Sequence, residues 1–386
     1  MAGVRQVATD GNGMDTPTRY IPASMCQSGS VIRPLELEGG VAMQITTIGL
    51  DLAKSVFQVH GADAQGRVVV RKKLRREQVV AYFAALPPCL VGMEVCGGAH
   101  YWARRLREFG HEVRLMPAQY VKPYVKTNKN DARDGEAICE AVGRPGMRFV
   151  PVKSVEQQEV LSMHRVRQGF VKARTAQANQ IRGLLAEFGL VAPAGIGNIV
   201  SKIPALLDAA TGLGAKTREL MGRLVEHFKV LDAQVQELER QIKAWHQGSE
   251  YSRRLEKIPG IGPLGASALV ASIADANAFK SGRQLAAWLG LVPRQNSSGG
   301  KTKLQGISKR GDSYLRALLI HGARSAIVAA QRWHKPSSWL AGLLARRHPN
   351  VAAVALANKI VRTVWALLAH EREFQADYVS RPPVAA

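Results

Sequence analysis

The chain has 386 residues, of which 53 are Lys or Arg and 30 are Asp or Glu, giving a formal net charge of +23 and a pI of about 10.3. This length allows two domains with a core each, and a hydrophobic content of 46% is ordinary for a globular protein. So large a positive excess indicates a polyanionic partner, with nucleic acid the first candidate and a membrane surface the alternative.

No apolar run reaches the length of a membrane span. The best candidate, residues 351–370, is broken by Lys359 and Arg362, so we expect a buried amphipathic helix and no membrane partner. The four cysteines show neither CxxC spacing nor a secreted disulfide pattern, which favours reduced thiols in a cytoplasm. They are Cys26, Cys89, Cys96 and Cys139.

Residues 1–42 are rich in Gly, Ser, Pro and Thr without periodicity, and they lack the layout of a signal peptide. We therefore expect a disordered N-terminal extension. Ordered pattern begins abruptly at Met43, which is a candidate for the natural start of the protein.

Strand and helix patterns then follow in a definite order. Three strand-like segments come first, and helical and strand-like segments alternate after them. The strand-like segments are 45–51, 55–63, 67–74, 89–95 and 111–116, and the helical ones are 77–86, 100–110 and a segment carrying Asp131 and Asp134. This order predicts a mixed sheet flanked by helices, as in the ribonuclease-H-like fold.

Two long helical segments come next. Residues 154–188 predict one long helix, and residues 217–246 carry apolar side chains in steps of three and four that form a heptad seam. An intramolecular helical hairpin and intermolecular coiled-coil pairing are equally compatible with this seam. Its residues are Met221, Leu224, Phe228, Leu231, Val235, Leu238, Ile242 and Trp245.

The remainder predicts a mostly helical C-terminal part. The expected organisation is an extension at 1–42, an α/β domain at 43–150, long helices at 151–250, a helical domain at 251–370 and a tail at 371–386.

Four carboxylates occupy notable places in this scheme. Asp51 and Glu94 end two predicted strands, and Asp131 and Asp134 lie one helical turn apart. Each acid alone reads as a surface charge or, for the last two, as a helix start that suits the helix dipole. Together they favour a cluster whose repulsion two Mg²⁺ ions would relieve, the arrangement that acts on phosphodiesters.

The glycines of "PGIGPLGASAL" predict a helix-hairpin-helix in which Gly260 and Gly262 let backbone N–H groups approach a phosphate; an ordinary tight turn is the alternative. A basic field follows, with ten Lys or Arg and one acid, Asp312, between Lys301 and His348. We expect sequence-independent phosphate contacts from it, and from the cations of helix 154–188. The candidates in the field are Lys301, Lys303, Lys309, Arg310 and Arg316.

Within "RQNSSGGKTK", Ser297 and Ser298 lie in a Gly-rich, cationic loop. Such a serine is either a solvated linker residue or a nucleophile whose attack on phosphorus is aided by nearby cations. Spacing does not separate these two interpretations.

Six segments together carry a family resemblance that extends from about Met43 to His370. They are "TTIGLDLAKSVFQVHG", "GMEVCGGAHYWARRL", "VKTNKNDARDGEAI", "IPGIGPLGA", "LAAWLGLVPRQNSSGGK" and "GISKRGDSYLRALLIHGARSA". In this combination and order the chain resembles the DEDD-type transposases of bacterial insertion sequences, the family of the Piv invertase.

The resemblance implies a RuvC-like domain with Asp51, Glu94, Asp131 and Asp134 as a Mg²⁺-binding tetrad. It also implies a serine that attacks DNA and forms a phosphoserine link. The family's serine precedes a glycine, which matches Ser298, and the doubled serine leaves Ser297 as an alternative. Further implications are a homo-oligomer (dimer or tetramer) joined by the long helices, a structured noncoding guide RNA as partner besides DNA, and action at the bacterial nucleoid.

Overall fold

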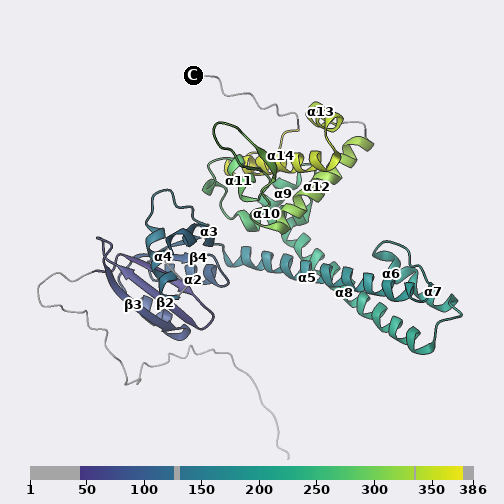
Figure 1. The fold of residues 1–386 in the computed structure, drawn as a ribbon, viewed down its shortest axis with the longest axis horizontal. Helices are drawn as coiled ribbons and strands as arrows, with labels where there is room; N and C mark the ends of the chain where they lie inside the picture. Colours follow the sequence, from purple (N-terminus) through teal and green to yellow (C-terminus); the bar gives the residue numbers. More distant parts are fainter. Residues whose placement is uncertain (1–43, 126–130, 334–335, 377–386) are drawn as a thin grey trace, which may run out of the picture. The chain divides into compact units, whose positions relative to one another are not determined.

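The computed structural model describes residues 44–125, 131–333 and 336–376 (Figure 1). The expected N-terminal extension at 1–42 lies outside the described residues, and so does most of the expected C-terminal tail.

The α/β domain is built on a five-stranded mixed sheet in the order β3-β2-β1-β4-β5. The first three strands form an antiparallel meander, and β4 and β5 run parallel to β1. This confirms the predicted mixed α/β architecture, which is consistent with a ribonuclease-H-like fold. The strands are β1 (Thr47–Leu52), β2 (Val56–Ala62), β3 (Val68–Arg75), β4 (Leu90–Glu94) and β5 (Glu112–Met116).

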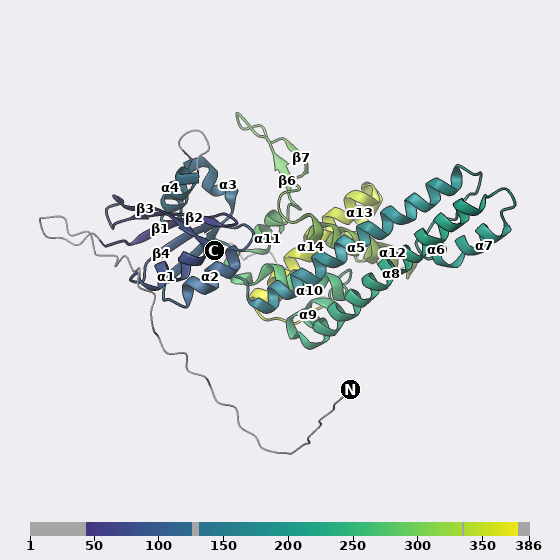
Figure 2. The same ribbon diagram turned by 90° about the horizontal axis from the view of Figure 1, so that it is seen from below.

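Helices cover both faces of this sheet (Figure 2). Because side chains alternate along a strand, Ile48, Leu50, Val91 and Met93 share one face, and they pack in one core with α1 and α2. The other face carries α4, whose Ile138 belongs to a second core with α3. The helical elements are α1 (Val79–Ala84), α2 (Ala99–Arg107), α3 (Ala118–Val121) and α4 (Asp131–Val142), with 3-10 turns η1 (Arg76–Gln78) and η2 (Lys122–Tyr124).

The two long helices form a helical hairpin within the chain (Figure 1). They are α5 (Val155–Ala186) and α8 (Ala215–Gly248), with the short helices α6 (Gly197–Ser201) and α7 (Ile203–Ala209) between them. Most of the predicted seam is buried, including Phe228 and Ile242, whereas Leu224, Leu238 and Trp245 are half-buried. The intramolecular hairpin, one of the two alternatives left open by the heptad pattern, is therefore present.

The C-terminal part has one main hydrophobic core, formed by buried side chains from Leu255 to Leu367. The apolar helix α14 meets the length and composition of a membrane span, but it packs Ala357, Ile360, Val361 and Val364 into this core. The elements are α9 (Glu250–Glu256), α10 (Pro263–Ile273), η3 (Ala276–Ala278), α11 (Gly282–Trp288), β6 (Pro293–Gln295), β7 (Leu304–Ile307), α12 (Ser313–Arg332), α13 (Ser338–Arg346) and α14 (Pro349–Ala369).

The Gly-rich segment expected as a loop is a two-stranded antiparallel hairpin, β6–β7, that extends from the end of α11 (Figure 2). Its turn is closed by Gly299 and Gly300 at φ values of 54° and 74°, which a two-residue hairpin turn requires and glycine adopts without strain. The N–H of Lys301 donates to the carbonyl of Ser298 at 3.0 Å across the turn. Ser298 therefore lies at the tip of an exposed ribbon.

Candidate functional site

Strand register brings Asp51 and Glu94 side by side. β1 and β4 are parallel neighbours in which Leu50 pairs with Met93, and each acid is the next residue along its strand. Equivalent positions on adjacent strands point to the same face of a sheet, so the two half-buried carboxylates project from one end of β1 and β4 in the same direction.

That direction is the face covered by α4. Gly49 and Gly92 lie two residues before Asp51 and Glu94, hence on the same face, and both contact α4 closely. A Cβ on Gly49 would overlap the backbone of Gly135, and a Cβ on Gly92 would lie 2.7 Å from Cβ of Val142. The two glycines let the helix lie directly on the strands.

The N-terminal end of α4 is directed toward the acidic end of β1. In its C-terminal half, Cys139 Sγ lies 3.7 Å from the carbonyl oxygen of Thr47, at the start of β1. One turn earlier, Gly135 lies over Gln58, whose register partner on β1 is Asp51. Asp134, adjacent to Gly135, is half-buried, and Asp131 opens the helix; the side chain of Asp131 lies outside the described residues.

The thiol of Cys96 lies close enough to both strand carboxylates for their charges to affect its pKa. Desolvation, and then the negative charges of Asp51 and Glu94, raise the pKa of this thiol. Two neighbouring carboxylates with oxygen donors suit a hard divalent cation in ligand type. Among the described side chains, no group of three or more His, Cys, Asp or Glu is arranged to hold a metal ion.

The two serines of the hairpin differ in their contacts. The hydroxyl of Ser297 accepts a hydrogen bond from Gln295 Nε2 at 2.9 Å on its own side of the hairpin. It accepts another from the backbone N–H of Lys303 at 3.3 Å, which ties the two sides together. No hydrogen bond reaches the hydroxyl of Ser298 within the described part of the chain. Ser297 thus has a structural role that Ser298 lacks, a distinction that spacing in the sequence did not provide.

The basic loop after β7 is fixed against the end of α11. A Cβ on Gly290 would overlap the backbone of Arg310, and Lys309 adopts a φ of 55°, a conformation that is uncommon outside glycine. The guanidinium of Arg316 donates to the carbonyls of Leu289 at 3.1 Å and Arg310 at 2.9 Å. Arg316 therefore holds the loop, whereas Lys309 and Arg310 are exposed for contact with phosphate, as are Lys301 and Lys303 on the hairpin.

The glycines of the turn between α9 and α10 also differ. Gly260 has a φ of 94°, and a Cβ there would lie 2.8 Å from the carbonyl oxygen of Gly322 on α12. Packing against α12 therefore accounts for this glycine without a phosphate. Gly262 is exposed at the start of α10, where backbone N–H groups are available.

Two of the cations expected to contact nucleic acid from α5 are used inside the helical hairpin. Arg167 Nε donates to Glu239 on α8 at 2.9 Å, and Arg174 forms an ion pair with Asp232. These pairs fix the packing of α5 against α8, so the presence of the two arginines is explained without contacts to DNA.

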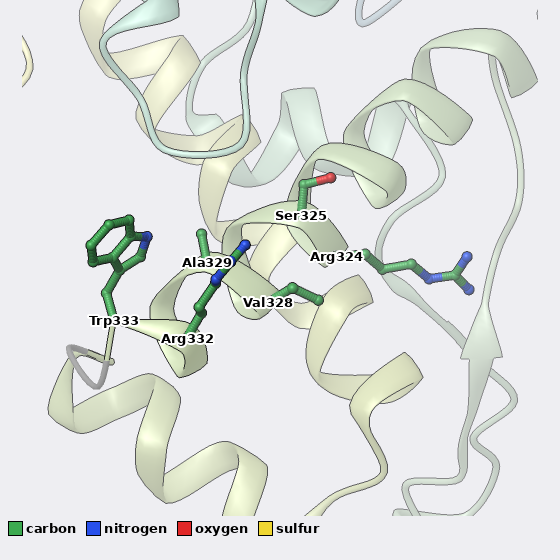
Figure 3. Close-up of a pocket in the computed structure, with 6 residues that line it drawn as sticks. All are labelled: Arg324, Ser325, Val328, Ala329, Arg332 and Trp333. Atoms are coloured by element: carbon green, nitrogen blue, oxygen red, sulfur yellow. The ribbon is translucent and has the colours of Figure 1, made fainter.

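A groove of about 390 Å³ follows the exposed side of α12 (Figure 3). Its lining combines arginines with apolar side chains and contains no carboxylate, thiol or imidazole, so it offers no metal ligand or general base. The lining residues are Arg324, Ser325, Val328, Ala329, Arg332 and Trp333.

Two segments of the chain match known family models. Residues 48–189 match the DEDD transposase domain of IS110 elements, and residues 252–337 match the domain described as "Transposase IS116/IS110/IS902 family". The first match contains the two strand carboxylates and α4, and the second contains the serine hairpin.

Relatives that match most of the chain are also transposases by name. The "Probable family 20 transposase" of Pseudomonas aeruginosa is 55% identical over 85% of this chain and 98% of its own length. The "Transposase for insertion sequence element IS1111A" of Coxiella burnetii is 43% identical over 86% of this chain and 92% of its own. That for element IS1328 of Yersinia enterocolitica is 43% identical over 83% and 96%. The chain belongs to the IS116/IS110/IS902 family of transposases.

Proposed function

We propose that this protein is a cytoplasmic recombinase that acts at the nucleoid and cuts and rejoins DNA to move its own insertion sequence through a phosphoserine intermediate. The observation that carries the proposal is the placement of Asp51 and Glu94 side by side, on the sheet face that α4 covers with its acidic N-terminal end directed toward them. This arrangement suits metal-assisted chemistry on a phosphodiester.

In this mechanism Asp51, Glu94, Asp131 and Asp134 hold Mg²⁺, which when bound supplies charge stabilisation to the scissile phosphate. Ser298 Oγ forms a bond to phosphorus while the bond from phosphorus to the 3′ oxygen breaks. The proton that the hydroxyl loses is regained overall by the leaving 3′ oxygen. Attack by a 3′ hydroxyl later reverses the step, and since the phosphoester retains the bond energy, rejoining needs no ATP.

Cations near the serine support its role. Lys301 and Lys303 lie on the β7 side of the hairpin tip, and Lys309 and Arg310 belong to the fixed loop that follows the hairpin. Such groups hold a phosphate and stabilise the charge that develops on it. Residues of this kind do not select a base sequence, so the choice of donor and target DNA falls to another component, for which we propose a structured noncoding RNA.

Covalent trapping tests the mechanism. Purified protein is incubated with Mg²⁺, labelled DNA of the element's end and the flanking transcript, then denatured and examined for a protein–DNA adduct. We expect an adduct with wild type and with Ser297→Ala, and none with Ser298→Ala or Asp51→Ala. Ser297→Ala weakens the hairpin, so a reduced yield there is compatible with the proposal.

Two other outcomes would overturn it. Cleaved DNA without an adduct indicates a metal-dependent junction nuclease in which water attacks. DNA binding that Asp51→Ala leaves unchanged, together with an absence of cleavage under conditions that support transposition in cells, indicates a non-catalytic binding protein.

A further inference from the structure

A run of cations occupies the end of the edge strand β3 of the α/β domain and the first residue of the turn η1 that follows it. β3 has β2 as its one neighbour in the sheet, and five of the six residues from 71 to 76 are Lys or Arg. All five are exposed, and Leu74 between them is buried. They lie far in sequence from the basic C-terminal field and have no part in the chemistry described above.

The strand register assigns three of these cations to one face. Arg71, Lys73 and Arg75 lie directly opposite His60, Gln58 and Val56 of β2, and residues directly opposite each other in an antiparallel pair share a face.

This face is the one that carries the carboxylates. The Cβ atoms of Gln58 and His60 are the nearest sheet side-chain atoms to a Cβ built on Gly135 of α4, at 3.8 and 3.5 Å. Gln58 in turn lies opposite Asp51. One row across the sheet therefore reads Lys73, Gln58, Asp51 and Glu94, with Lys73 two strand spacings, about 10 Å, from Asp51.

The remaining two cations lie on the opposite face, where each makes a cation–π contact. Lys72 Nζ lies 5.1 Å from the ring centroid of Tyr82, and the guanidinium carbon of Arg76 lies 5.2 Å from that of Trp102. By contrast, Arg71, Lys73 and Arg75 make no ion pair or cation–π contact with any described residue.

Charged side chains on an edge strand also prevent edge-to-edge association of sheets. Positive side chains on either face serve that purpose. It therefore does not explain why the three cations that make no ion pair or cation–π contact with a described residue share the face of Asp51 and Glu94.

We propose that Arg71, Lys73 and Arg75 form a phosphate-binding track, along which the backbone of a nucleic-acid strand follows the edge of the sheet beside α4 toward the end where Asp51 and Glu94 lie. The track rests on the proposed function in that the carboxylates act on nucleic acid. Its cations are about 7 Å apart along the strand, close to the axial rise of two nucleotides. Phosphate contacts of this type position a strand without reading its sequence.

Disulfide trapping tests the track directly in the full-length chain. Lys73→Cys and, as the matched control from the opposite face, Lys72→Cys are made in a background with Cys26→Ser and Cys96→Ser. Each is mixed with duplex DNA, single-stranded DNA or RNA that bears a thiol tether on a backbone phosphate. We expect Lys73→Cys to cross-link at least several-fold faster than Lys72→Cys, and the probe that reacts fastest identifies the strand that the track holds.

Salt dependence gives a second measurement. Neutralising three phosphate contacts with Arg71→Gln, Lys73→Gln and Arg75→Gln together is expected to remove about 2 to 3 from the slope of log affinity against log salt. Raising salt from about 50 to 200 mM should then weaken wild type roughly 20- to 40-fold more than the variant. Lys72→Gln should leave the slope unchanged.

Equal cross-linking from both faces, or an unchanged slope in a variant whose circular dichroism matches wild type, would overturn the track. Its failure is distinguishable from failure of the proposed function. A phosphoserine adduct without cross-linking at β3 removes the track alone, whereas cross-linking without an adduct leaves the track standing and removes the serine mechanism.

Discussion

At the scale of single residues, neighbouring positions with the same chemistry have different roles. Ser297 and Ser298 carry adjacent hydroxyls, yet that of Ser297 accepts a hydrogen bond from across the β6–β7 hairpin and that of Ser298 lies at its tip. Gly260 and Gly262 likewise differ in their packing. The carbonyl oxygen of Gly322 leaves no room for a Cβ at Gly260, whereas a Cβ at Gly262 would meet no atom within 4 Å. The sequence suggested both pairs as candidates, but contacts from distant segments decide between the members of each pair.

Cys96 provides a reporter of cation binding that does not depend on DNA cleavage. Desolvation and the charges of Asp51 and Glu94 raise the pKa of its thiol, so a cation that neutralises those charges should lower that pKa and increase the reactive thiolate. Adding Mg²⁺ near pH 8 is expected to accelerate alkylation of Cys96, by roughly three- to fourfold for each unit by which the pKa falls, since a less basic thiolate is more abundant but less nucleophilic. The rate is measured by mass spectrometry in a Cys26→Ser background.

The other two described thiols serve as internal controls. Burial raises the pKa of Cys89 and of Cys139 to about 11, so both should react slowly with or without Mg²⁺. Asp51→Asn should speed alkylation of Cys96 in the absence of Mg²⁺ and weaken the response to it. An alkylation rate of wild-type Cys96 that is indifferent to Mg²⁺ would argue against a cation site at Asp51 and Glu94.

At the scale of elements, close packing holds α4 directly on β1. Gly49→Ala is expected to push α4 away from the strand, because the new Cβ would overlap the backbone of Gly135. Overpacking of this kind costs about 1–3 kcal/mol of unfolding free energy. We expect lower stability in urea together with loss of the phosphoserine adduct.

Gly143→Ala, directly after α4, is the matched control, since a Cβ there would meet no atom within 4 Å. It should leave both the urea midpoint and the adduct unchanged. Wild-type stability in Gly49→Ala would mean that α4 tolerates displacement and that its close contact with β1 is not needed.

The hydrophobic periodicity of the sequence predicted which segments are strands and helices, but it did not predict which of these segments pack against each other. The alternation along 45–74 and the heptad steps in 217–246 are local patterns, so the sheet meander and the long helix α8 follow from them. Periodicity does not encode pairing partners. It therefore left open whether α8 pairs within the chain, and it did not reveal that Lys73, Gln58, Asp51 and Glu94 form one row.

At the scale of the whole molecule, exposed positive charge lies on two parts of the chain that have separate hydrophobic cores. The cations of β3 belong to the α/β domain, and Lys301, Lys303, Lys309 and Arg310 belong to the C-terminal part.

Two histidines form hydrogen bonds at the segment that connects these two parts. His100 of α2 accepts from the backbone N–H of Lys153 at 3.2 Å, just before α5 begins. His164 of α5 is buried and hydrogen-bonded to Tyr314 of α12 at 2.9 Å and to Ser267 of α10 at 3.0 Å.

These histidines predict that the folded protein loses stability in mild acid. Desolvation, followed by the charge of Arg167, lowers the pKa of His164 from 6.5 to about 4, and desolvation with nearby Lys and Arg lowers that of His100 to about 4. The unfolded chain therefore binds more protons than the folded one between pH 6.5 and 4. The stabilisation is complete above pH 6.5 and is lost as the pH falls toward 4, by up to about 3 kcal/mol for the buried His164.

We expect the urea midpoint to fall as the pH is lowered from 7.5 to 4.5. It should fall less in His164→Gln, because glutamine does not titrate in this range. Carboxylates titrate in both proteins, so the difference between them isolates the histidine, and equal falls would show that His164 does not determine the acid sensitivity.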